Sequence, residues 1–167
     1  KIAIRLVPAK GKKEEFKLEY IGSGVMGTPE LALLEAYKEI ARFAKVPLKM
    51  NASVAKLLDT TDPLERSILL DELKSAEEVT DKYEIEIANY LTELAKEEMS
   101  PNTSVRVRGL LTAANDLEKI GDIYYQIAMN LENKNTKKVY FVPKQRQNLK
   151  RMCLLLEDAF DTMLENL

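Results

Sequence analysis

The chain has 167 residues, of which 46% are hydrophobic and 31% charged, so its length and composition suit one globular domain with its own core. Lysine and arginine number 25 against 27 acidic residues, and the formal net charge of -2 argues against nucleic-acid binding, which needs a clearly basic face. A single cysteine and no histidine exclude a disulfide framework, a thiolate metal site and histidine-based catalysis. No stretch approaches the roughly 20 apolar residues of a membrane-spanning helix.

Residues 1–27 differ in composition from the rest of the chain. They begin with a short alternating apolar run, continue with a basic cluster and end with three glycines. The basic residues are Lys10, Lys12, Lys13 and Lys17, and the glycines are Gly22, Gly24 and Gly27. This composition predicts an extended connector with at most one strand. Because the sequence begins at a lysine and not at a methionine, we expect the connector to follow an upstream segment.

Three helix starts carry one signal, a capping side chain followed by proline at the first helical position. The signal occurs at Thr28-Pro29, Asp62-Pro63 and Ser100-Pro101. Pro143 is expected to begin a fourth helix, although Val142 is a poor cap. These starts predict helices over residues 29–58, 63–99, 101–132 and 143–167. We expect Pro47 to kink or divide the first of them, since proline cannot donate the helical hydrogen bond.

Apolar residues recur at alternating spacings of three and four along the last three of these helices, which is typical of helices packed in a bundle. The second helix carries Leu69, Leu73, Ala76, Thr80, Tyr83, Ile87, Tyr90 and Leu94; the third carries Val107, Leu110, Ala114, Leu117, Gly121, Tyr124, Ala128 and Leu131; and the fourth carries Leu149, Cys153, Leu156, Phe160, Met163 and Leu167. Short connections make successive helices antiparallel neighbours. The sequence therefore predicts an all-α fold, an up-and-down antiparallel helical bundle over residues 28–167.

Each of these three helices places an acid directly after two successive core positions. The pairs are Glu77 and Asp81, Glu118 and Asp122, and Glu157 and Asp161. Residues four apart are neighbours on a helix, so each pair costs stability. If the second and third helices meet along this edge, their four carboxylates converge and repel unless they are protonated, hydrated or bridged by a cation such as Mg, Ca, Mn or Fe. The alternative is a solvated acidic face.

Gly121 occupies a core position between the acids of the third helix. Glycine inside a helix costs about 1 kcal/mol relative to alanine. We therefore expect a neighbouring helix to approach closely there, most simply through its backbone.

Residues 115–122 read Asn-Asp-Leu-Glu-Lys-Ile-Gly-Asp and resemble the signature helix of PhoU-type proteins, with lysine in place of the usual arginine. Residues 77–87 are similar to the preceding helix of that family, with its acid-x-x-x-Asp pattern. Such motifs bind metal clusters on the surface of PhoU bundles. The resemblance implies metal ligands at Glu118 and Asp122 and, by a looser match, at Glu77 and Asp81, with Mg, Mn or Fe as the ion.

Residues 17–21 and 28–33 are similar to the linker between the membrane part and the cytoplasmic PhoU-like tail of sodium/phosphate cotransporter II proteins. The resemblance implies a regulatory domain on the cytoplasmic face of the cell membrane. It also implies a transporter domain in the same chain, upstream of this sequence, and a homodimer. The basic residues between Lys10 and Lys17 would then lie near an anionic membrane surface.

Two other functions fit the sequence, a free-standing PhoU-type regulator of phosphate transport and signalling, and a helical dimerisation or spacer module without a ligand. Enzyme activity is not expected. No glycine-rich phosphate loop follows a strand, and a packed bundle offers no sugar cleft to its paired carboxylates.

Overall fold

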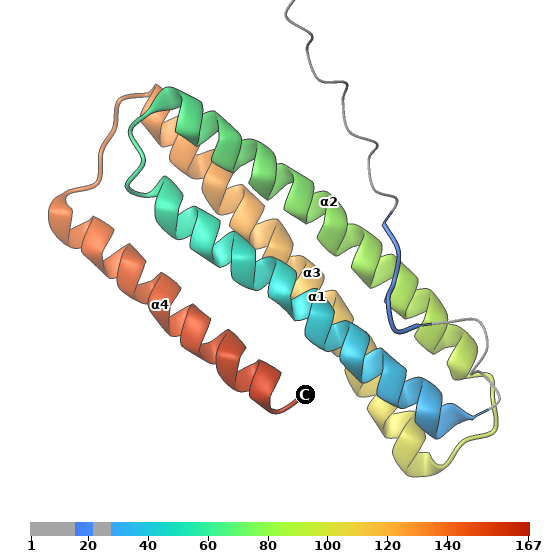
Figure 1. Ribbon diagram of the computed structural model, residues 1–167. Helices are drawn as coiled ribbons and strands as arrows, with labels where there is room; N and C mark the ends of the chain where they lie inside the picture. Colours follow the sequence, from blue (N-terminus) through green and yellow to red (C-terminus); the bar gives the residue numbers. More distant parts are fainter. Residues whose placement is uncertain (1–15, 22–27) are drawn as a thin grey trace, which may run out of the picture.

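The computed structural model describes residues 16–21 and 28–167, and Figure 1 shows four α-helices in this part of the chain. They are α1 (Pro29–Leu57), α2 (Pro63–Leu94), α3 (Pro101–Thr136) and α4 (Pro143–Glu165). The described residues contain no strand, which confirms the all-α prediction. None of these four helices has the combined length and apolarity of a membrane span. Most of the predicted connector lies outside the described residues, and residues 16–21 are not helical.

Proline occupies the start of every helix, as expected. The Asp62 carboxylate accepts the backbone N–H of Glu65 at 3.1 Å, and the Ser100 hydroxyl accepts that of Thr103 at 3.1 Å. The expected cap at Thr28 is wrong, since its side chain makes no such bond. Its backbone, at φ -135° and ψ 87°, differs from the extended conformation in which the other two caps reach their helices.

Two helix ends differ from the prediction, and Pro47 does not divide α1. α2 ends at Leu94, its last buried residue, and not near residue 99. α3 continues past residue 132 to Thr136. It ends where Lys138 adopts a left-handed conformation (φ 55°) and the Val139 N–H bonds back to the Lys134 carbonyl at 3.0 Å, which is a Schellman motif.

α1, α2 and α3 pack on one another around a shared core, and successive helices run in opposite directions (Figure 1). The predicted apolar registers of α2 and α3 are confirmed, because almost every position in them is buried. α1 supplies the third face of this core with buried residues that include Ile40, Phe43, Met50 and Leu57.

α4 lies along one side of the three-helix core and, among the described helices, packs against α1 alone (Figure 1). The buried Asn51 of α1 donates a hydrogen bond to the backbone carbonyl of Cys153 at 2.9 Å. The predicted core stripe of α4 is only partly confirmed. Phe160 is its one buried residue, whereas Leu156 is 43% exposed, because a helix outside a completed core buries only a narrow strip.

Residues 16–21, the N-terminal segment, lie against α1 and α2 (Figure 1). The fully buried Glu39 carboxylate of α1 accepts the backbone N–H groups of Glu19 at 2.9 Å and Tyr20 at 2.8 Å. Arg42 donates to the same carboxylate at 3.0 Å. The Phe16 ring packs edge-on against Tyr83, with 4.8 Å between the ring centroids. The segment is therefore held by its backbone as well as by its apolar side chains.

Candidate metal-binding site

α2 and α3 approach closely where Thr80 meets Gly121. A Cβ atom on Gly121 would lie 2.7 Å from Thr80 Oγ1 and 2.9 Å from Thr80 Cγ2. Thr80 is fully buried, and its hydroxyl donates to the Glu77 carbonyl at 2.7 Å, so this side chain has no room to move. The expected close approach at Gly121 is confirmed, although a threonine side chain and not a backbone fills the space.

The acidic pairs of α2 and α3 flank this contact. Asp81 follows Thr80 in sequence, and Asp122 follows Gly121. One carboxylate oxygen from each of Glu77, Asp81 and Asp122 lies within 4.8 Å of the other two, and all three residues are half-buried. Glu118, one turn before Asp122, is half-buried as well but lies outside this group of three. We call these four residues the acidic cluster.

Burial and mutual repulsion change the acidity of two members of the cluster. Burial raises the pKa of the Glu77 carboxyl, and the negative charges of Asp81 and Asp122 raise it further. Burial likewise raises the pKa of Glu118, and the charges of Asp122 and Asp81 add to that effect. Asp122 of α3 thus raises the pKa of Glu77 on α2, and Asp81 of α2 raises the pKa of Glu118 on α3.

Within the described residues, none of the four carboxylates of the acidic cluster forms an ion pair, although Lys74 lies near Glu77 and Lys119 near Glu118. Half-buried carboxylates without a cationic partner carry unbalanced negative charge. They can share protons, hold water or bind a hard cation, and an all-oxygen ligand set suits Mg²⁺, Mn²⁺ or iron better than softer metals.

Compared with known protein families, residues 40–131 match the PhoU domain. The match covers more than half of the 167 residues and contains all four residues of the acidic cluster. This chain belongs to the PhoU domain family. The PhoU domain is a helical bundle with a regulatory role in phosphate transport and not a catalytic one. No match was found among curated proteins or among solved structures.

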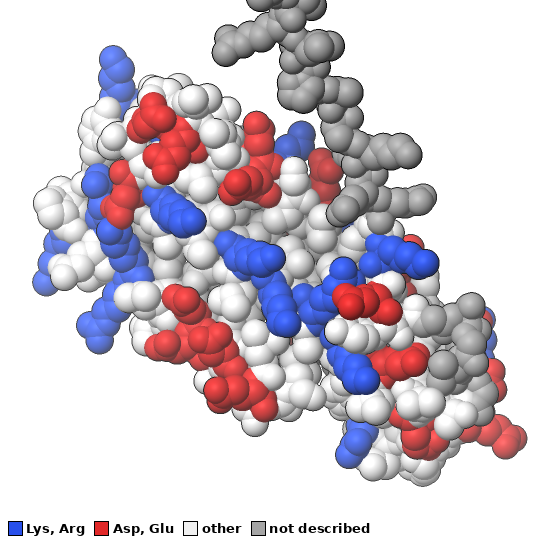
Figure 2. Space-filling view, viewed as in Figure 1, with Lys and Arg blue, Asp and Glu red and all other residues white. Residues whose placement is uncertain are grey.

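The third acidic pair of the chain lies outside the matched residues and apart from the cluster. Glu157 and Asp161 are exposed on α4, which packs on α1 and not on α2 or α3 within the described residues. Figure 2 shows acidic and basic side chains distributed over the face on which α4 lies. The three pairs have the same spacing, but carboxylates from two helices come together only where the helices meet along their acidic edges.

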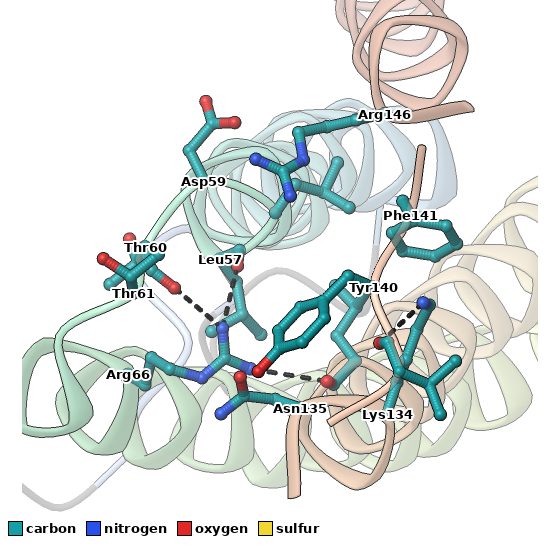
Figure 3. A pocket seen from close by; sticks show the side chains of 13 residues that line it. Leu57, Asp59, Thr60, Thr61, Arg66, Lys134, Asn135, Tyr140, Phe141 and Arg146 are labelled. Carbon is teal, nitrogen blue, oxygen red and sulfur yellow. Dashed lines mark hydrogen bonds between the residues drawn. The ribbon is translucent and has the colours of Figure 1, made fainter. Parts of the chain in front are cut away.

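Sequence reasoning missed two buried charged residues, Glu39 and Arg66. Arg66 donates to the backbone carbonyls of Leu57 at 3.2 Å and Thr60 at 2.9 Å (Figure 3). It also donates to the Glu132 carboxylate at 2.7 Å. The small cavity beside it, about 70 Å³, is lined partly by residues that follow α3. These hydrogen bonds occupy the guanidinium N–H groups, so Arg66 connects the end of α1 to the last turns of α3. The sequence contains a signal for both residues. Each is a charged residue at a core position of the helical repeat, three or four residues from apolar core residues.

Proposed function

We propose that this PhoU domain is the regulatory domain of a sodium-dependent phosphate cotransporter, lies on the cytoplasmic face of the cell membrane and modulates phosphate uptake. Family membership supports the connection with phosphate transport. The resemblance of residues 17–21 and 28–33 to the cotransporter linker supports attachment to a transporter domain of the same chain. The transport path itself would belong to that membrane domain.

The observation that carries a ligand-dependent role is the convergence of Glu77, Asp81 and Asp122 on one side of the Thr80–Gly121 contact. We propose that the acidic cluster, with Glu118 as a further ligand, binds Mg²⁺, Mn²⁺ or an iron ion. A cation there would offset the repulsion that raises the pKa values of Glu77 and Glu118. Because its ligands come from two helices, such an ion would also hold α2 and α3 in one register.

Sodium-dependent uptake by the full-length protein in membrane vesicles tests the proposal. The variant Asp81→Asn/Asp122→Asn should still transport phosphate, but at a changed rate or with a changed response to phosphate supply. The matched control is Glu157→Gln/Asp161→Asn, which removes an equally spaced pair outside the cluster and should behave as the native protein. Unchanged uptake by the cluster variant under every phosphate supply would favour a spacer, and complete loss despite normal insertion would make the bundle part of the transport machinery.

A homodimer belongs to the same proposal. Exposed apolar side chains of α3 and α4, among them Ile127, Met152 and Leu156, line a groove of about 250 Å³ that a second copy could cover. Light scattering of the native chain and of Met152→Ser/Leu156→Ser should give a dimer and a monomer respectively, and a monomeric native chain would contradict this part.

The second candidate is a free-standing PhoU-type regulator that acts on a separate transporter. Family membership supports both candidates equally. The residues that precede Lys1 in the intact protein distinguish them, because several hydrophobic spans there would establish attachment to a transporter.

A further inference from the structure

The exposed face of α1 carries a row of lysines. Lys38, Lys45, Lys49 and Lys56 are all exposed, and residues 40–58 contain no aspartate or glutamate. Figure 2 shows a run of basic side chains over the middle of this face of the molecule, where Figure 1 places α1. Together with the exposed Lys17 of the N-terminal segment, these four residues form what we call the lysine face.

The positive charge of the lysine face is only partly balanced by nearby acids. Within the part of the chain that the structure describes, none of its five lysines forms an ion pair. The nearby Arg42 is neutralised by Glu19 and Glu39. Further acids of α2 lie beside the lysine face: Glu72 near Lys49 and Lys56, and Glu86 and Glu93 near Lys17. The formal net charge of the chain is -2, so this row concentrates positive charge on one helix of a slightly acidic chain.

The N-terminal segment extends the lysine face to the point where the preceding chain meets the bundle. Glu39 fixes the backbone of Glu19 and Tyr20, and the Lys38 ammonium lies 6.0 Å from the centre of the Tyr20 ring. A shallow depression of about 560 Å³ is lined jointly by this segment and by Lys38, Lys45 and Lys49. Residues 16–21 are therefore anchored beside the row of lysines.

We infer that the lysine face docks the domain on an anionic lipid bilayer. Lysine is a hydrated point charge on a flexible stem, which suits a fluid layer of headgroups better than bidentate recognition of one partner group. The row from Lys38 to Lys56 spans about 27 Å along one continuous helix at spacings that keep it on one side, so its lysines can meet a flat surface together. Each lysine near such a surface contributes about 1 kcal/mol, or roughly a fivefold gain in affinity. The inference rests on the proposed function only for the presence of a bilayer next to the domain.

Co-sedimentation of the complete 167-residue chain with phosphatidylcholine vesicles, with and without phosphatidylglycerol, provides the test. The native chain should bind only the anionic vesicles, and binding should fall as salt rises. The variant Lys38→Gln/Lys45→Gln/Lys49→Gln/Lys56→Gln should lose at least about tenfold in affinity. The matched control Lys82→Gln/Lys119→Gln/Lys137→Gln/Lys144→Gln removes the same charge from exposed lysines elsewhere and should lose less than about threefold.

Equal losses in the two quadruple variants would overturn the inference, since net charge and not this face would then govern binding. Binding to neutral vesicles, or binding to soluble polyglutamate without binding to anionic vesicles, would overturn it as well. None of these results bears on uptake by the acidic-cluster variant, so this inference and the proposed function fail separately.

Discussion

The contact between Gly121 and Thr80 decides whether the acids of α2 and α3 can come together. Alanine at Gly121 gains about 1 kcal/mol of helix propensity, but its methyl would lie 2.7 Å from Thr80 Oγ1 in a buried contact. Overpacking costs about 1–3 kcal/mol. We expect Gly121→Ala to leave the thermal midpoint unchanged or to lower it by up to about 8 °C, at about 2–4 °C per kcal/mol for a chain of this size.

Gly109 of α3 offers the matched control for that substitution, because nothing lies within 4 Å of the position of its Cβ atom. Gly109→Ala should raise the midpoint by roughly 2–4 °C, since only the propensity gain applies. A clear rise for Gly121→Ala as well would contradict the packed contact.

Glu118 gives the acidic cluster a dependence of stability on pH. Its folded pKa is raised, so the folded state binds protons more readily than the unfolded state. Stability should therefore fall as pH rises from the unfolded pKa through the raised folded value, and the penalty should be absent at lower pH. In urea unfolding without metal, Glu118→Gln should stabilise the chain at neutral pH by about 0.2–0.5 kcal/mol for each relieved neighbour, and the gain should vanish below about pH 4. Glu97→Gln, an exposed change elsewhere, is the control, and an equal gain there would refute the interpretation.

Glu39 is expected to determine how firmly the N-terminal segment is held. Its carboxylate accepts two consecutive backbone N–H groups, those of Glu19 and Tyr20. Glu39→Met keeps the length of the side chain but removes both acceptors, so these two amides should exchange with solvent at least about tenfold faster, corresponding to roughly 1.4 kcal/mol. Amide exchange measured by NMR provides the test, with the amides of α3 as internal control. Rapid exchange of Glu19 and Tyr20 in the native chain would show that the segment is not held.

At the scale of whole elements, α4 is expected to detach independently of the other helices. Phe160 is its one buried residue, and Phe→Ala in a core costs about 3–5 kcal/mol. Phe160→Ala should raise amide exchange along α4 while α2 and α3 remain protected. Leu154→Ala, on the exposed side of α4, should have no such effect. Simultaneous loss of protection in all four helices would mean that α4 is an integral part of the core.

The sequence predicted the elements and registers of α2 and α3 because their mostly apolar core positions repeat at spacings of three and four along each helix. For α4 it predicted a core stripe that is confirmed only in part, because α4 lies outside the three-helix core and leaves Leu154, Leu155 and Leu156 exposed. The end of α3 was also not predicted. Lys138 adopts the left-handed conformation there, and lysine is not a residue type that indicates such a turn. For the acidic cluster, spacing and resemblance identified all four residues. Spacing alone could not distinguish them from the isolated pair on α4, because the difference is that α2 and α3 pack together along their acidic edges.

At the scale of the whole molecule, the acidic cluster and the lysine face lie on different helices and have opposite charge. The cluster belongs to α2 and α3, whereas the lysine face belongs to α1 and the N-terminal segment. A domain so arranged could rest on an anionic surface through α1 and leave the edge between α2 and α3 open to ions. Docking and ion binding would then take place at separate sites, on helices that share one core.

Titration calorimetry with Mn²⁺ and Mg²⁺ on the complete chain tests the central claim, that the acidic cluster is a cation site, most directly. The native chain and Glu157→Gln/Asp161→Asn should bind alike, because the pair on α4 lies outside the cluster. Asp81→Asn/Asp122→Asn should lose binding by at least about tenfold, or about 1.4 kcal/mol, because it removes one ligand from each helix. Equal heats for all three proteins, or no binding to the native chain, would contradict the claim and leave the cluster a solvated acidic edge.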